Sequence, residues 1–118
     1  MSSIDMDIHI SNITQQIFSD FIRAELGPDT ECIHNKSSIQ VKLPNTETII
    51  EHRLYHRLGR PDTAEINLII TEYNLTFSIA SLYELKDIIQ IAKESNDPSK
   101  LISYITIEMM GTPWRSWA

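Results

Sequence analysis

The segment "SLYELKDIIQIAKES" at 81–95 most constrains the fold, because its pattern is that of an amphipathic helix. Ser81 and Glu84 have the spacing of a capping box, which marks a helix start. Apolar residues then recur at helical spacing, while charged residues take the other face: Leu82, Leu85, Ile88, Ile89 and Ala92 against Lys86, Asp87, Lys93 and Glu94. A helix with one apolar face must bury it against another element, so the chain must also supply that element.

Two further helices are predicted. The stretch 12–26 has apolar residues at helical spacing, with Ser11 or Asn12 as N-cap and Gly27-Pro28 as the stop. Asp97-Pro98 and Gly111 similarly delimit a helix over 98–110. Because that stretch is rich in β-branched residues, a strand is the alternative there.

Alternating apolar and polar residues predict strands in three other places. The opening stretch 4–10 alternates isoleucine and methionine with aspartate and histidine, as in a half-buried strand. Residues 30–43 have the pattern of a hairpin that turns at Asn35-Lys36. Two more strands are expected over about 65–72 and 75–80, with a turn at Tyr73-Asn74.

The stretch 47–58 fits either a helix or a strand, because its similar residues lie four positions apart. That spacing places residues on one side of a strand and nearly on one side of a helix. A helix separates the apolar, histidine and arginine residues into three sectors, whereas a strand places both His52 and His56 among the apolar residues. A helix is the favoured prediction, although Thr48, Ile49 and Ile50 suit a strand.

These elements predict an α+β fold: a single domain over 1–118 with an antiparallel sheet of about four to six strands built from hairpins, packed against two to four helices. The tail 111–118 is expected to be irregular. A single cysteine, Cys32, excludes an intramolecular disulfide and favours a reducing compartment, so a cytoplasmic location is expected. The sequence shows neither a membrane-spanning apolar run nor a signal-peptide pattern.

Charge is distributed unevenly along the chain. Residues 1–35 carry a formal charge of −5, residues 36–61 carry +3, and the remainder carries −4, within a net charge of −6. An acidic chain is repelled by nucleic acid and by anionic membranes, so neither is the favoured partner. The acidic N-terminal third instead suits a protein with a basic surface.

The basic segment "EHRLYHRLGR" at 51–60 holds the first set of candidate binding residues: Arg53, Tyr55, Arg57 and Arg60. Arginine and tyrosine are enriched at the energetic centres of protein interfaces, and the guanidinium binds carboxylate or phosphate through two hydrogen bonds. The alternative is that these arginines pair within the domain with nearby acids, namely Glu47, Glu51, Asp62 and Glu65.

The tail supplies the second set of candidate binding residues, Trp114, Arg115 and Trp117. The favoured expectation is that the tail docks on its own core, with the tryptophans covering a sheet edge or a helix groove. The alternative is a short linear anchor that binds a partner.

Three smaller sets have catalytic or metal-binding residue types but lack a complete motif. His52 and His56 have metal-ligand spacing, but no carboxylate lies between them as in a metalloprotease helix, and Asp5, Asp7 and His9 share a face of the predicted first strand. Cys32 and His34 are an incomplete nucleophile and base pair. We therefore expect no cofactor and no metal.

The favoured prediction of function is a small non-enzymatic protein of the inhibitor, immunity or anti-defence kind, which occludes the surface of a partner protein. Homo-oligomers are compatible with it. The alternatives are a metal- or phosphate-dependent hydrolase that uses the histidine and aspartate residues, and a nucleic-acid-binding module that uses residues 51–60.

Overall fold

The protein is built around an antiparallel sheet in which each strand pairs with its neighbour in the sequence. The computed structural model describes residues 6–44, 47–108 and 114–115. The strands are β1 (Ile33–His34), β2 (Ser38–Lys42), β3 (Thr48–Tyr55), β4 (Thr63–Ile70), β5 (Leu75–Ser78) and β6 (Trp114–Arg115). The helices are α1 (Gln15–Leu26), α2 (Leu82–Glu94) and α3 (Pro98–Ser103), with short helical turns η1 (Ile10–Asn12), η2 (Thr71–Tyr73) and η3 (Tyr104–Glu108). The predicted single-domain α+β fold is confirmed.

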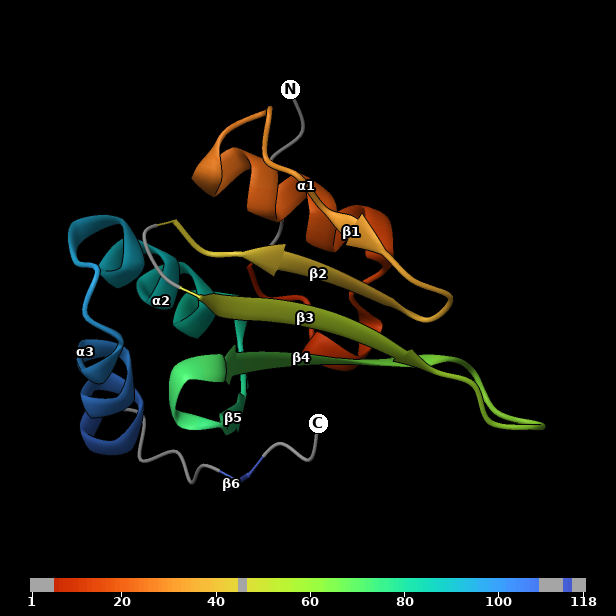
Figure 1. The fold of residues 1–118 in the computed structure, drawn as a ribbon. Coiled ribbons are helices and arrows are strands. Elements are labelled where there is room, and N and C mark those ends of the chain that lie inside the picture. Colours follow the sequence, from red (N-terminus) through yellow and green to blue (C-terminus); the bar gives the residue numbers. More distant parts are fainter. Residues whose placement is uncertain (1–5, 45–46, 109–113, 116–118) are drawn as a thin grey trace.

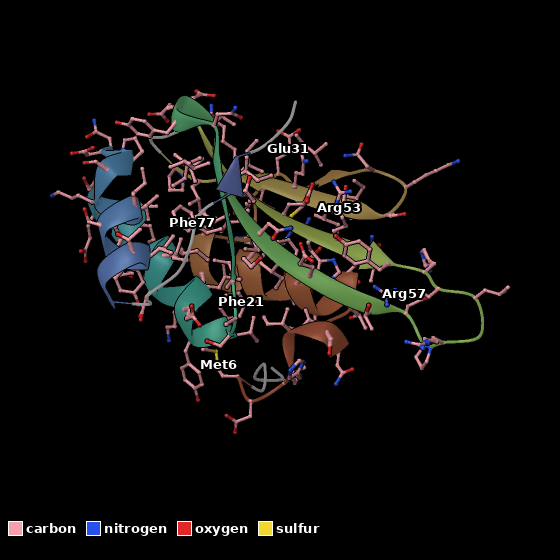
Figure 2. The ribbon with its side chains drawn as sticks, turned by 90° about the horizontal axis from the view of Figure 1, so that it is seen from below. Met6, Phe21, Glu31, Arg53, Arg57 and Phe77 are labelled. Atoms are coloured by element: carbon pink, nitrogen blue, oxygen red, sulfur yellow. The ribbon has the colours of Figure 1, made fainter. Side chains whose placement is uncertain are left out.

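Helices α1 and α2 lie on one face of the sheet, and the opposite face of β3 and β4 has no described helix over it (Figures 1 and 2). The two helices bury their apolar faces against inward-facing side chains of the strands. The fully buried side chains include Phe18, Phe21 and Ile22 of α1, Leu82, Leu85 and Ile88 of α2, and Ile39, Ile50, Ile66, Leu68 and Phe77 of the sheet. Burial of apolar area by this layer is the main stabilising term.

The predicted helices 12–26 and 82–95 are confirmed, and their ends follow from capping. In α2 the Ser81 hydroxyl accepts a hydrogen bond from the Glu84 amide at 3.2 Å. Helix α1 begins later than predicted, at Gln15, because Thr14 rather than Ser11 or Asn12 is the N-cap. It ends at Gly27, whose φ of 118° favours glycine.

The last predicted helix is confirmed in the described residues of its range. Asp97 caps α3 through a hydrogen bond from the Ser99 amide at 3.0 Å. The helix continues as the π-helical turn η3 to Glu108, so the strand alternative is wrong there. Residues 109–110 lie outside the described part.

Both predicted short-range hairpins are confirmed. Strands β1 and β2 are joined through Asn35, whose amide donates to the Ser38 carbonyl at 2.8 Å. Strands β4 and β5 are joined through η2 and Asn74, which adopts the left-handed conformation that asparagine tolerates.

The predicted strand at 4–10 is wrong for the residues that the structure describes. Residues 6–8 form a turn, and η1 follows at Ile10–Asn12. The apolar side chains of Met6, Ile8 and Ile10 pack on the core nonetheless. Alternation predicts which side chains are buried, but a strand also needs a partner for its backbone, and no described strand pairs with this segment.

The predicted helix over 47–58 is also wrong, because Thr48–Tyr55 form the central strand β3. Five residue pairs join β3 to β2, and eight join it to β4. This strand pairing and the β-branched residues at the start of β3 outweigh the helical pattern. That pattern depended only on how a helix would group the apolar, histidine and arginine side chains. The strand turns Ile50, His52 and Leu54 toward the helices and the alternate residues toward the opposite face.

The C-terminal tail contributes a short strand where irregular backbone was expected. The backbone of Trp114–Arg115 forms β6 and pairs with Leu75–Thr76 of β5. This pairing agrees with the expectation that the tail docks on a sheet edge. Residues 111–113 and 116–118, which include Trp117, lie outside the described residues.

His52 is the buried polar residue at the centre of β3. Its side chain is fully buried, its ring centroid lies 5.2 Å from that of Phe18, and Nε2 donates to the Ile13 carbonyl at 2.6 Å. Nδ1 has no hydrogen-bond partner among the described residues. Burial lowers the pKa of His52, against the opposing effect of the hydrogen bond to Ile13, because desolvation penalises the imidazolium.

This burial predicts acid destabilisation that depends on His52. An unfolded histidine binds a proton near pH 6.5, whereas folded His52 binds it at a lower pH. The free energy of unfolding should therefore fall as the pH drops from about 6.5 toward the lower folded pKa. Urea unfolding at pH 7.5 and pH 5.5 would measure this fall, which should be smaller in His52→Leu. An equal fall in wild type and His52→Leu would contradict the assignment.

Candidate functional site

The residues of the predicted basic segment occupy two places rather than one helix face. Arg53 and Tyr55 lie on the helix-free face of β3, whereas Arg57 and Arg60 lie in the loop 56–62 between β3 and β4. Figure 1 shows this loop projecting beyond the rest of the sheet, and Figure 2 shows Arg53 over the strands and Arg57 near the start of the loop. The loop is therefore a distinct candidate site.

A tight turn forms the end of the loop. The Arg60 amide donates to the Arg57 carbonyl at 3.1 Å, and Gly59 has a φ of 76°. A positive φ at the third of four residues is the pattern of a type II turn, which glycine accepts without steric cost. Leu58, the second residue of the turn, points into solvent with a relative exposure of 106%.

An imidazole and a carboxylate are paired across the neck of the loop. His56 Nδ1 lies 2.8 Å from Asp62 Oδ1, and both side chains are more than half exposed. This contact joins the residue that follows β3 to the residue that precedes β4. Together with the glycine turn, it limits the conformations that the tip can adopt.

Arg53 is paired with an acid of its own domain. This was the alternative expectation for all the arginines of the basic segment. Its Nε and Nη2 each donate to the Glu51 carboxylate at 3.2 Å, and Gln40 Nε2 donates to the same group at 3.0 Å. Burial favours the neutral form of Glu51, whose side chain is almost inaccessible, but these hydrogen bonds hold its pKa below the ordinary value. Arg53 thus stabilises the sheet face, while half of its side chain stays exposed.

The other two arginines, Arg57 and Arg60, make no side-chain hydrogen bond or ion pair with any described residue. The acids that were expected to pair with them have other contacts. Glu47 contacts Lys42 at 3.0 Å, Asp62 contacts His56, and Glu65 accepts from Asn67 at 2.8 Å. The projecting loop therefore carries two guanidinium groups that are free to bind a carboxylate or a phosphate.

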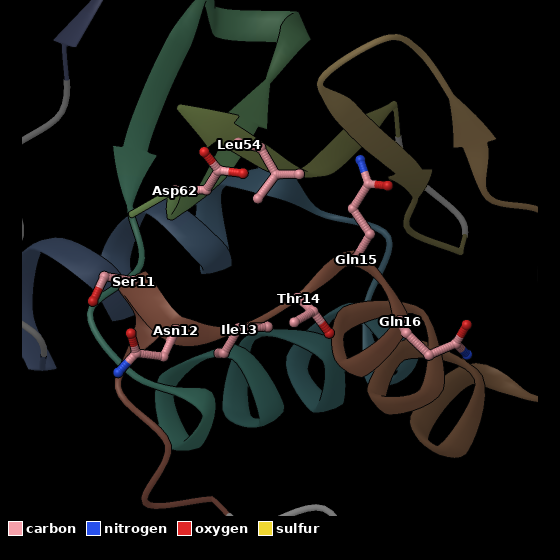
Figure 3. A pocket seen from close by; sticks show the side chains of 8 residues that line it. All are labelled: Ser11, Asn12, Ile13, Thr14, Gln15, Gln16, Leu54 and Asp62. Carbon is pink, nitrogen blue, oxygen red and sulfur yellow. The ribbon is translucent and has the colours of Figure 1, made fainter. Parts of the chain in front are cut away.

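Two hollows flank the base of the loop. One, of about 430 Å³, lies between the segment Ser11–Gln16 and the pair Leu54 and Asp62 (Figure 3). The other, of about 570 Å³, lies between η1 and the ends of β3 and β4, with Tyr55 and Arg57 in its wall. The exposed tip, its free arginines and these hollows make up the candidate surface, and Arg57 belongs to both the loop and the second hollow.

Sequence reasoning missed Leu58 and Gly59 because it interpreted Gly59 and Pro61 as the end of a helix. The same two residues between a strand-like segment and the alternating segment at 65–72 are also a hairpin signal. Reading 47–55 as a strand would have placed Leu58 at a hairpin tip.

The smaller predicted sets form no metal-ligand cluster among the described residues. His52 is in the core while His56 is in the exposed loop, and no three potential metal ligands cluster within the described residues. Cys32 packs against the core, whereas His34 is exposed. Asp5 and the side chains of Trp114 and Arg115 are not described, so the proposed roles of these residues stay predictions.

Among the described residues, no helix has the length and apolar character needed to cross a membrane. Comparison with protein-family models, with curated proteins and with solved structures finds no match for this chain.

Arg53 and Arg57 should respond differently to truncation. Arg53→Ala removes two hydrogen bonds from the nearly buried Glu51 carboxylate, so the free energy of unfolding should fall by about 1 kcal/mol, a modest value because the guanidinium is half exposed. Arg57→Ala breaks no described contact and should change it by less than about 0.5 kcal/mol. Urea unfolding of both variants at pH 7 would measure this difference. Equal effects would show that Arg53 is as free as Arg57.

Proposed function

We propose that this chain is a small non-enzymatic protein that binds another protein and occludes its surface through the β3–β4 loop. Leu58 enters an apolar depression of the partner, and Arg57 and Arg60 bind carboxylates at its rim. The observation that carries this proposal is the fully exposed Leu58 between two unpaired arginines on a turn held by Gly59.

The chemistry of the loop suits protein recognition. An exposed leucine gains free energy only when water is removed from it, and an arginine fork gains most from a carboxylate in a partly desolvated interface. The turn and the contact between His56 and Asp62 reduce the conformational entropy that the loop loses on binding. A preformed, projecting tip loses little conformational entropy when it contacts a partner, which supports the inhibitor, immunity or anti-defence class.

The two loop arginines also determine which charged groups the partner must present. The partner must present carboxylates where Arg57 and Arg60 contact it, whatever its net charge. The acidic N-terminal third of this chain then serves long-range steering toward basic regions elsewhere on the partner. We place this binding in the cytoplasm, in keeping with the single cysteine.

Substitution at the tip tests the proposal. Tagged protein is recovered from the cells that produce it, any co-purifying chain is identified by intact mass, and its affinity for purified variants is measured by calorimetry. Leu58→Asp should weaken binding by thirtyfold or more, roughly the effect of losing an interface hot spot. The control is Tyr83→Asp, which changes another exposed side chain, on α2.

Three outcomes contradict the proposal. These are a partner that binds Leu58→Asp as tightly as wild type, recovery of the chain alone, and retention only by polyanion resin with a steep dependence on salt. The last outcome would instead support nucleic-acid binding.

Rigidity of the turn gives an independent prediction. Gly59→Ala meets no atom within 4 Å but is strained at a φ of 76°, so the loop should change shape and partner affinity should fall about tenfold. Gly27→Ala is the matched control, because it is also strained, at a φ of 118°, but lies at the end of α1. It should lower stability without changing affinity. Unchanged binding by Gly59→Ala would show that the turn is not preorganised for the partner.

A further inference from the structure

The hollow of about 570 Å³ beside the loop has walls of opposite charge. Arg57 lines one part of it, and Glu65 lines another. Tyr55 and His9 also line it, and the imidazole of His9 is held 2.7 Å from the Ser11 hydroxyl. A hollow built in this way offers hydrogen-bond donors and acceptors to a ligand that carries both.

The cationic wall is available, because the guanidinium of Arg57 has no hydrogen bond or ion pair among the described residues. Its fork of N–H donors matches the geometry of a carboxylate. Exchanging water for a carboxylate in a concave site also strengthens the interaction, because fewer water molecules screen the charges.

The acidic wall is fixed in place by the sheet. Glu65 Oε1 accepts a hydrogen bond from Asn67 Nδ2 at 2.8 Å. Burial and the nearby Glu65 carboxylate raise the pKa of the Tyr55 hydroxyl, which stays neutral and hydrogen-bonds to Glu65. Because a carboxylate has about four lone-pair sites, Glu65 can still accept from a ligand. A ligand that consists only of anionic acceptor oxygens would be repelled by Glu65.

We infer that this hollow binds an acidic residue within a peptide segment, with the side-chain carboxylate on Arg57 and a backbone N–H on Glu65. The inference rests on the proposed function and adds the partner chemistry: an aspartate or glutamate of the partner sits in the hollow while Leu58 contacts the partner's apolar surface. Arg57 belongs to both the loop and the hollow, which makes the two parts continuous.

A small probe tests the hollow without the partner. Full-length ¹⁵N-labelled protein is titrated with N-acetyl-aspartate N-methylamide at constant ionic strength, and backbone and arginine Nε–H shifts are followed by NMR. We expect saturable shifts at Tyr55, Arg57 and Glu65 with a Kd on the order of 1–10 mM, as suits a ligand of this size. Inorganic phosphate at the same ionic strength should bind several-fold more weakly.

Variants separate a specific pocket from a general attraction of anions. Arg57→Gln should weaken the probe tenfold or more, and Arg57→Lys should weaken it less, because it keeps the charge and loses the fork. Arg23→Gln is the matched control, because Arg23 of α1 lies outside both the loop and the hollow, and it should bind the probe as wild type does. The ¹⁵N spectrum of each variant verifies that it is folded.

The inference is overturned by shifts that do not saturate, by equal binding of phosphate, or by equal losses in Arg57→Gln and Arg23→Gln. Its failure is distinct from failure of the proposed function. If Leu58→Asp loses the partner while the wild-type chain binds no probe, the loop function is kept and the hollow is rejected. If the chain binds the probe but no partner is recovered, the hollow is kept and the loop function is rejected.

Discussion

The pairing of β3 with β4 is the constraint on which the rest of the structure depends. It runs through eight residue pairs, from Thr48↔Ile70 to Tyr55↔Thr63. The strand pairings on either side of this hairpin are shorter, since β2 pairs with β3 only up to Arg53 and β5 pairs with β4 only from Asn67. The last pairs of the ladder therefore extend beyond the flanking strands, and the loop projects because its supporting hairpin is longer than its neighbours.

The same register decides which polar residues become structural. A strand exposes alternate residues on opposite faces, so fixing Ile50 in the core also places His52 there and turns Glu51 and Arg53 outward. His52 then needs the Ile13 carbonyl as a partner, and the nearly buried Glu51 needs Arg53. A single geometric choice thus places two ionisable groups in environments where their protonation affects stability.

Sequence patterns predicted most of the fold and little of the site. The helices at 12–26 and 82–95 and the hairpins at 30–43 and 65–80 carry caps, turn residues and periodicities that act locally, so they could be recognised without tertiary information. The stretch 47–55 could not, because residues four apart share a face in either structure and only pairing with β2 and β4 decides between them. The segment at 6–10 failed for the converse reason: its alternation records burial, but no described strand pairs with it.

Correct assignment of β3 also changes how its arginines are interpreted. On a helix, Arg53 and Arg57 would share one sector and one role. On the strand and its loop they differ in what lies within reach: Arg53 stands beside a nearly buried carboxylate, whereas Arg57 and Arg60 lie past the last ladder pair, where the nearest acids already have partners. Composition marked the segment as unusual, but only the geometry separates an arginine that stabilises the fold from two that are free to bind. Leu58, exposed between those two, is the residue whose position no folding requirement of the described chain explains.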